Sequence, residues 1–322
     1  MDWQPACSLE LMRLRATVLR KIREYFYAQQ VMEVETPVLG EFVGTDPYLD
    51  YFTSHYALSD RLFYMQSSPE FAMKRLLAAG SGSIYQIGKA FRNGESGRYH
   101  NPEFTILEWY RVGFTLKQLM DDVELLLGRL LPAVRFSKPA ERIRYVDIFA
   151  KHTGLDALVF DALKYQAVAV SHGLPEAQRL CAEDHAAWLD FLFSHIIQKQ
   201  MAGQGVCLIY DYPACLPSLA RLKPENALIT ERVEVFIEGM EVGNGFFELA
   251  DAHEQTLRFT KDIALRQLNG SAPIAKDWRF LAALQSGLPD CAGIAIGIDR
   301  LLMAIGQKNH INDVLAFPIE SA

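Results

Sequence analysis

The chain has 322 residues, of which 50% are hydrophobic and 22% are charged, a composition typical of a globular protein with one large or two modest domains. Its formal net charge of −7 gives no broad attraction to a polyanion, so any contact with nucleic acid would need a local basic patch. The N-terminus lacks a signal-peptide pattern, and Asp299 and Arg300 interrupt the apolar stretch 291–306. We therefore expect a cytoplasmic protein without a membrane span.

The five cysteines are odd in number and scattered, and none belongs to a C-x-x-C pair. This pattern predicts reduced, mostly buried thiols rather than a disulfide framework or a zinc site.

The N-terminal third predicts a helix, a short strand and a second helix. Residues 8–30 carry apolar side chains at steps of three and four, which favours an amphipathic helix. Val31–Glu35 alternates like a strand and stops at Thr36 and Pro37, because proline removes a ladder donor. Phe71–Ala79 reads as a short helix that ends at a Gly-Ser run.

The remaining elements predict an α+β fold, an antiparallel sheet flanked by helices. Two strands, Ile84–Phe91 and Phe104–Tyr110, flank a polar loop, and loops of that length are usually functional. Residues 115–205 have helical periodicity in Leu116–Leu131 and Ala186–Gln200, and we interpret them as an inserted helical region. The later elements are strands at 206–210, 232–237, 241–248 and 293–298, with helices at 251–268 and from Asp299.

The polar loop carries Arg92, Asn93, Arg98, His100 and Asn101 next to the aromatic Phe104. An arginine fork binds phosphate oxygens bidentately and keeps its charge, so we expect Arg92 to bind a polyphosphate at its α-phosphate. The alternative is a solvated hairpin tip with surface ion pairs.

Three glutamates, Glu234, Glu241 and Glu248, follow one another at seven-residue intervals in a glycine-containing β-rich stretch. Mg²⁺ needs one or two protein carboxylates when phosphate and water complete its octahedron, so Glu234 and Glu241 would suffice. A strand with a solvated face explains the spacing equally well.

The segment Gly293–Arg300 reads Gly-Ile-Ala-Ile-Gly-Ile-Asp-Arg. Its glycines let a strand approach a ligand closely, and Arg300 at the turn into a helix is placed to cover a purine face opposite Phe104. A buried structural strand is the alternative.

A set of acids is placed to receive ammonium groups. Glu70 follows Ser68 and Pro69, while Glu108 and Tyr110 lie two apart and so share one strand face. A substrate with two amines needs two acidic contacts, because a buried unpaired ammonium is costly. The alternative is one buried salt bridge with Lys74 or Arg75.

Together these segments resemble class II aminoacyl-tRNA synthetases. The helix–strand–Pro segment 26–39, the run FRN…RYHNPEFTILEWY at 91–110 and GIAIGIDR at 293–300 resemble motifs 1, 2 and 3 of that family. SPE at 68–70 and EVGNGFFEL at 241–249 are similar to the lysyl-tRNA synthetase group. The likeness spans nearly the whole chain, so a single catalytic domain is expected over 1–322.

The resemblance implies a role for each matching residue. Motif 1 would form a homodimer interface, Arg92 would bind the α-phosphate of ATP, and Phe104 and Arg300 would sandwich adenine. The other implied ATP contacts are Asn93, Gly94, His100, Asn101, Glu241, Val242 and Gly297, with Mg²⁺ on Glu234 and Glu241. The implied amino-acid contacts are Ser68, Pro69, Glu70, Glu108, Tyr110, Asn244, Glu248 and Ala295. Arg92 and Arg300 would be the catalytic pair.

Departures from lysyl-tRNA synthetases point to a different acceptor. Motif 1 is reached within about 40 residues, so we expect no anticodon-binding OB domain. Ala295 replaces the usual glycine, as in the elongation factor P–(R)-β-lysine ligases, which are truncated lysyl-tRNA synthetase paralogues. Gly94 stands where both families usually have a glutamate that contacts the adenine amino group. Glu95 or a backbone atom would have to make that contact here. Tyr99 replaces an arginine, with Arg98 one place earlier as in the ligases.

The resemblance therefore implies an ATP-dependent ligase that activates (R)-β-lysine or lysine as an adenylate. It would transfer the acyl group to a lysine ε-amine of elongation factor P and release pyrophosphate and AMP. Gly94 and Tyr99 keep open a paralogue that binds ATP or lysine without turnover. A minimal tRNA-charging synthetase is the third hypothesis, although the net acidity and the absent OB domain argue against tRNA as a partner.

Overall fold

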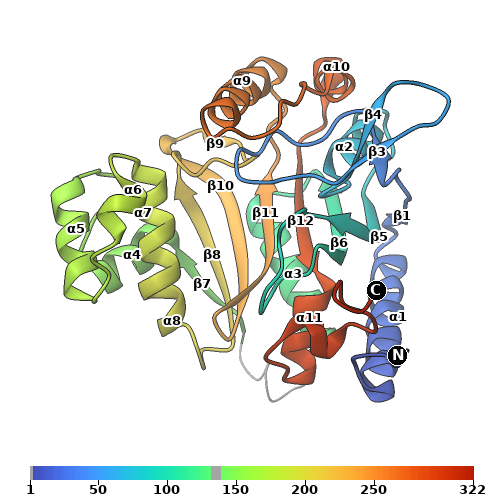
Figure 1. Ribbon diagram of the computed structural model, residues 1–322, viewed down its shortest axis with the longest axis horizontal. Coiled ribbons are helices and arrows are strands. Elements are labelled where there is room, and N and C mark those ends of the chain that lie inside the picture. The colour runs from blue at the N-terminus through green and yellow to red at the C-terminus, as the bar shows by residue number, and fades with distance from the viewer. Residues whose placement is uncertain (1–2, 132–138) are drawn as a thin grey trace. The chain divides into compact units, whose positions relative to one another are not determined.

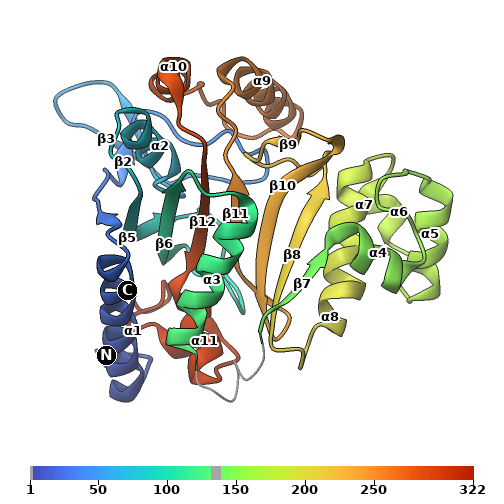
Figure 2. The same ribbon diagram turned by 180° about the vertical axis from the view of Figure 1, so that it is seen from behind.

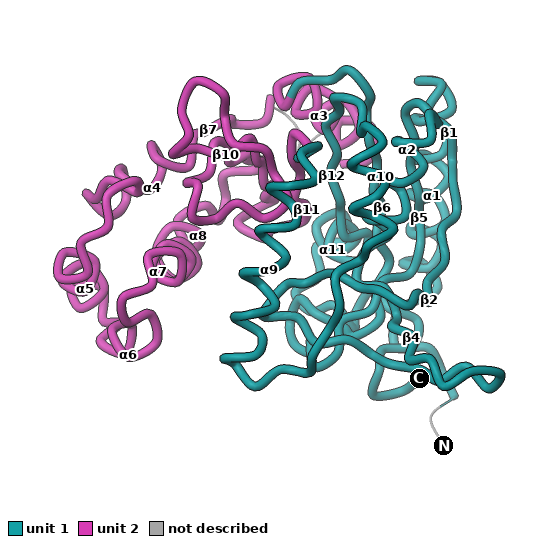
Figure 3. The backbone as a smooth tube through the Cα atoms, turned by 90° about the horizontal axis from the view of Figure 1, so that it is seen from above, with its two compact units in different colours: residues 1–115, 249–322 teal, residues 116–248 magenta. Residues whose placement is uncertain are grey.

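The computed structural model describes residues 3–131 and 139–322. The chain forms two compact units, unit 1 with residues 1–115 and 249–322 and unit 2 with residues 116–248 (Figure 3). Each unit combines antiparallel strand pairs with helices, so the predicted α+β class is confirmed. The single catalytic domain expected over 1–322 stays a prediction, because the division describes packing alone.

The main sheet of unit 1 has the strand order β1-β5-β6-β12 (Figure 1). Its strands span Met32–Glu33 (β1), Ile84–Phe91 (β5), Glu103–Val112 (β6) and Cys291–Gly297 (β12). Strand β1 pairs parallel with β5, and the other two pairs are antiparallel. A smaller sheet, which the sequence did not predict, has the order β2-β4-β3, with Leu39–Gly40 (β2), Thr53–His55 (β3) and Leu62–Met65 (β4).

The helices of unit 1 begin at capping residues that satisfy their first backbone N–H groups. They are Leu9–Ala28 (α1), Glu70–Ala78 (α2), Ala252–Leu268 (α9), Trp278–Gly287 (α10), Ile298–Gly306 (α11) and the 3₁₀ turn Ile311–Val314 (η2). Ser8, Asp251 and Asp277 accept hydrogen bonds at the starts of α1, α9 and α10. Helices α2, α9 and α10 gather at one end of the strands and α11 at the other (Figures 1 and 2).

Helix α1 supplies an aromatic cluster that fixes it to the sheet of unit 1. Phe26 is fully buried and stacks on Tyr85 of β5 with 4.3 Å between ring centroids. Its ring also meets Trp109 of β6 edge-on at 5.5 Å. The apolar face predicted for residues 8–30 therefore packs on β5 and β6, the two strands that carry the site described below.

Unit 2 has a sheet of order β11-β10-β8-β7, with β9 also paired to β10. Its strands are Glu141–Arg144 (β7), Val206–Pro213 (β8), Leu222–Lys223 (β9), Asn226–Ile237 (β10) and Met240–Phe247 (β11). Its helices are Leu116–Leu130 (α3), Tyr145–Thr153 (α4), Ala162–Ser171 (α5), Ala177–Cys181 (α6), His185–Leu192 (α7), the π-helix Phe193–Ile197 (η1) and Gln198–Gln200 (α8). Trp188, Tyr145 and Tyr165 are the largest fully buried side chains of the core that α4, α5 and α7 share with β8.

Three local predictions need correction. The segment 115–205 is not wholly helical, because β7 lies within it and pairs parallel with β8. The helix expected at 186–200 contains the π-helical turn η1. The strand expected at 31–35 is limited to β1, since the chain leaves the ladder before Pro37.

We predict that Phe26→Ala lowers the free energy of unfolding by about 3–5 kcal/mol, because it leaves a cavity between Tyr85 and Trp109. Arg13→Ala on the exposed side of α1 is the control and should change it by less than about 0.5 kcal/mol. Denaturant titration measures both, and equal effects would contradict the described packing of α1.

Candidate functional site

The register of β5, β6 and β12 places a row of candidate residues on one sheet face. Glu108 lies opposite Gln86 on one side and Ala295 on the other, and Tyr110 lies opposite Gly293. Directly opposed residues share a face, so this row faces the same way. The common face predicted for Glu108 and Tyr110 is confirmed, because the Tyr110 hydroxyl donates to Glu108 Oε1 at 2.6 Å.

Ser68 ties the start of α2 to this row. Its hydroxyl donates to Glu108 Oε2 at 2.7 Å and accepts from the backbone N–H of Glu70 at 3.0 Å. Glu70 in turn accepts from the buried Lys74 ammonium at 2.6 Å. The salt bridge that the sequence left open therefore forms with Lys74, while Glu108 receives hydroxyl donors.

The electrostatics of this group favour a bound cation. Burial and, to a smaller extent, the nearby Glu70 raise the pKa of Glu108 to about 7, against the hydrogen bonds from Tyr110 and Ser68 and the charge of Lys74. A buried carboxylate whose ionised form is disfavoured gains most from an ammonium that arrives with a ligand. Glu70 is paired with Lys74, and the predicted roles of Glu70 and Glu108 in binding two amino groups of one ligand stay predictions.

The loop between β5 and β6 brings several cations together. Arg92 lies over Phe104, with 5.2 Å from its guanidinium carbon to the ring centroid, and its NH1 is 3.8 Å from Glu95. Arg92 Nε is buried and, within the described residues, has no hydrogen-bond partner. Arg300 Nε donates to the Tyr99 carbonyl at 3.2 Å. These arginines thus converge on one loop, as a polyphosphate site requires.

Other loop residues hold the loop itself. Asn101 donates to the Glu103 carbonyl at 2.6 Å and accepts from the Ile319 N–H at 3.0 Å. Gly94 has φ +79°, which disfavours the glutamate found there in the related families. The His100 Nε2 lies 2.6 Å from Arg300 NH2 and 3.9 Å from Glu95, so Glu95 is within reach of the loop cations.

Asp299 is a positioning residue that is absent from the site predicted from the sequence. Its buried carboxylate accepts from the backbone N–H of Thr105 at 2.7 Å and pairs with Arg15 of α1. This links the turn before Arg300 to β6 and α1. The only signal in the sequence was an acid in the first turn of α11.

In unit 2, strands β10 and β11 place Glu234 in a buried network. Arg232 NH2 donates to Glu234 Oε1 at 2.5 Å, and Tyr212 donates to Oε2 at 2.6 Å. Arg232 Nε also donates to Asn244 Oδ1 at 3.1 Å, and Asn244 lies opposite Glu234 in the ladder. Glu234 and Asn244 are among the residues predicted from the sequence, whereas Arg232 is not, although its spacing of two from Glu234 signals a shared strand face.

The second predicted metal ligand, Glu241, lies near this network. Burial raises the pKa of Glu234 to about 7, with Glu241 adding to the rise and Arg232 opposing it. Two close carboxylates that repel each other fit Mg²⁺, a hard cation that prefers oxygen ligands. Within residues 3–131 and 139–322 no cluster of three metal-binding side chains occurs. The predicted contacts of Val242 with ATP, and of Asn244 and Glu248 with the amino acid, remain predictions.

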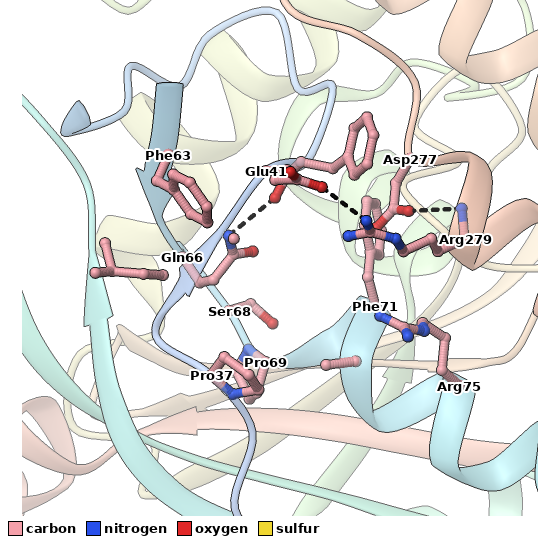
Figure 4. Close-up of a pocket in the computed structure, with 14 residues that line it drawn as sticks. Pro37, Glu41, Phe63, Gln66, Ser68, Pro69, Phe71, Arg75, Asp277 and Arg279 are labelled. Atoms are coloured by element: carbon pink, nitrogen blue, oxygen red, sulfur yellow. Dashed lines mark hydrogen bonds and ion pairs between the residues drawn. The ribbon is translucent and has the colours of Figure 1, made fainter. Parts of the chain in front are cut away.

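A cavity of about 320 Å³ opens in unit 1 between β2, the start of α2 and the start of α10 (Figure 4). Its polar lining includes Ser68, Arg75 and Arg279, and Arg279 pairs with Glu41 at 2.7 Å. Such a volume suits a small molecule. Because Ser68 lines it and also binds Glu108, the cavity adjoins the acidic group.

The family of the chain follows from comparison with known proteins. Residues 1–321 match the model of the tRNA synthetases class II (D, K and N). The chain belongs to the class II tRNA synthetase family. Within this family it is 43% identical to an elongation factor P–(R)-β-lysine ligase of Vibrio parahaemolyticus, over 100% of this chain and 99% of the relative.

Two further class II relatives carry the same name. The ligase of Vibrio atlanticus is 44% identical over 98% of both chains, and that of Mannheimia succiniciproducens is 40% identical over 99% of this chain and 98% of its own. The expected resemblance to these ligases is confirmed. Among the described residues, no helix of this class II family member is both long and apolar enough to cross a membrane.

We predict that the buried Glu108 carboxyl group lowers the free energy of unfolding as the pH rises from about 4.5 to 7. Its pKa is higher folded than unfolded, so in this window the folded protein holds a proton that the unfolded chain releases. Between these two pH values, the free energy of unfolding of the wild type should fall by on the order of 3 kcal/mol more than that of Glu108→Gln. The control Glu103→Gln alters an exposed carboxyl. Urea titrations across pH measure this, and parallel curves for wild type and Glu108→Gln would contradict it.

Proposed function

We propose that this protein activates lysine or (R)-β-lysine with ATP and transfers the acyl group to a lysine ε-amine of elongation factor P. The observation that carries the proposal is the pair of acids Glu70 and Glu108, held by Ser68 beside one sheet face. Two separated acids match a substrate with two amino groups. The class II family membership and the ligases among the relatives support this reading.

The first step joins the amino acid to the nucleotide. A carboxylate oxygen attacks the α-phosphorus of ATP, the bond to the bridging oxygen breaks, and pyrophosphate leaves with the electron pair. No protein nucleophile is needed, because positioning and charge stabilisation suffice for in-line transfer. Arg92 is the residue we assign to the α-phosphate, since its buried Nε has no hydrogen-bond partner in the part of the chain that the structure describes. Asp299 holds the turn that carries Arg300.

The second step forms the amide. The deprotonated ε-amine attacks the acyl carbon, the bond to the phosphate oxygen breaks, AMP leaves, and one proton is released. In this proposal Glu234 and Glu241 would hold Mg²⁺, which would supply positive charge to neutralise the phosphates. Arg232 and Tyr212 then orient Glu234 through its two carboxylate oxygens.

We predict pyrophosphate exchange that depends on the amino acid, with α-lysine and the two β-lysine enantiomers compared side by side. Arg92→Ala should slow exchange by about 10² or more, because charge stabilisation on the α-phosphate is lost. Lys89→Ala, which alters an exposed cation of β5, the strand that ends just before Arg92, should leave it unchanged. Chelating divalent cations should abolish exchange. Exchange that none of these amino acids stimulates would overturn the proposal in favour of a paralogue that binds without turnover.

The proposal includes a homodimer through motif 1. Four apolar side chains from the end of α1 to β2 are exposed, namely Tyr27, Met32, Val38 and Leu39, and exposed apolar side chains suit an interface. We predict twice the chain mass in sedimentation equilibrium. Met32→Glu should shift the protein toward the monomer, since it places charge in the interface, whereas Leu268→Glu on α9 should not. A wild-type monomer at micromolar concentration would contradict this part.

A further inference from the structure

Gln86 is a buried polar residue beside Glu108 that no predicted role uses. It lies on β5 directly opposite Glu108 in the ladder, and only 5% of it is exposed. Its carbonyl oxygen Oε1 is buried and has no hydrogen-bond partner among the described residues. An acceptor left in this state costs about 1–3 kcal/mol. Such an atom in a native structure calls for a donor that the chain itself does not supply.

The amide of Gln86 has space because of the next residue on the same face. A Cβ added at Gly88 would lie 3.0 Å from Gln86 Nε2, a distance tighter than ordinary contact. Residues two apart on a strand point the same way, so the amide lies along β5 over Gly88. Any side chain at position 88 would displace it.

The missing donor is best supplied by a primary ammonium. Gln86 and Glu108 stand opposite each other, and the two oxygens of Glu108 already accept from Ser68 and Tyr110. A carboxylate retains further lone pairs, and an ammonium has three N–H donors to divide among neighbouring acceptors. A neutral carbonyl adds a contact without adding a third negative charge to Glu70 and Glu108.

We propose that Gln86 is a specificity-determining residue whose Oε1 accepts a hydrogen bond from the side-chain ammonium of the amino-acid substrate. This inference rests on the proposed function, and it assigns the ammonium a neutral acceptor in addition to Glu108. Gly88 is the residue that keeps the amide in place. An alkyl or hydroxyl side chain in the substrate would leave the Gln86 carbonyl less well paired.

The test is pyrophosphate exchange with Gln86→Leu, which keeps the volume and removes the acceptor. We expect the KM for lysine or β-lysine to rise about tenfold, which corresponds to one charged hydrogen bond, with the KM for ATP unchanged. Gln86→Glu, which retains an acceptor oxygen but adds a third negative charge, should raise this KM less than Gln86→Leu does. Gly88→Ala, which keeps Gln86 but displaces its amide, should raise the same KM.

Binding of an inhibitor distinguishes the proposed contact with the substrate ammonium from a merely structural role of Gln86. The lysine analogue with a hydroxyl in place of the side-chain ammonium should lose less affinity than lysine on Gln86→Leu. Equal losses, or an unchanged lysine KM in folded Gln86→Leu and Gly88→Ala, would overturn the inference and leave a bound water as the partner of Gln86. A wild type without amino-acid-dependent exchange would instead sink the proposed function, so the two failures are distinguishable.

Discussion

The constraint on which the candidate site depends is a carboxylate buried among hydroxyl groups. Glu108 accepts hydrogen bonds from Ser68 and Tyr110, and the buried Lys74 nearby bonds to Glu70. Burial therefore disfavours the charge on Glu108. The pairing of β5, β6 and β12 keeps Glu108 in this buried position despite the unfavourable free energy of burying its charge. A ligand ammonium that binds Glu108 would reduce this unfavourable free energy.

The rest of unit 1 serves to hold that row and the arginine loop in register. Phe26 of α1 packs on Tyr85 and Trp109, the paired residues next to Gln86 and Glu108 on β5 and β6. Asp299 ties the end of β12 to Thr105 and to Arg15 of α1. One helix thus supports both the acidic row and the turn before Arg300, which places chemistry on rigid elements.

Sequence patterns predicted what periodicity and local chemistry control. The face shared by Glu108 and Tyr110 follows from period two, and the hairpin Ile84–Phe91 to Tyr110 follows from two β-rich runs around a polar loop. The partners that come from distant segments could not be read in this way. Arg15 with Asp299, and Gln86 opposite Glu108, depend on which strands and helices become neighbours, which no local pattern encodes.

The measurement that tests the central claim most directly is the mass of elongation factor P after incubation with this protein, ATP and (R)-β-lysine. The account predicts a gain equal to one lysyl group, located on a lysine side chain, no gain without ATP, and a gain slowed by about 10² or more with Arg92→Ala. An unchanged mass, with tRNA aminoacylated instead under the same conditions, would contradict it.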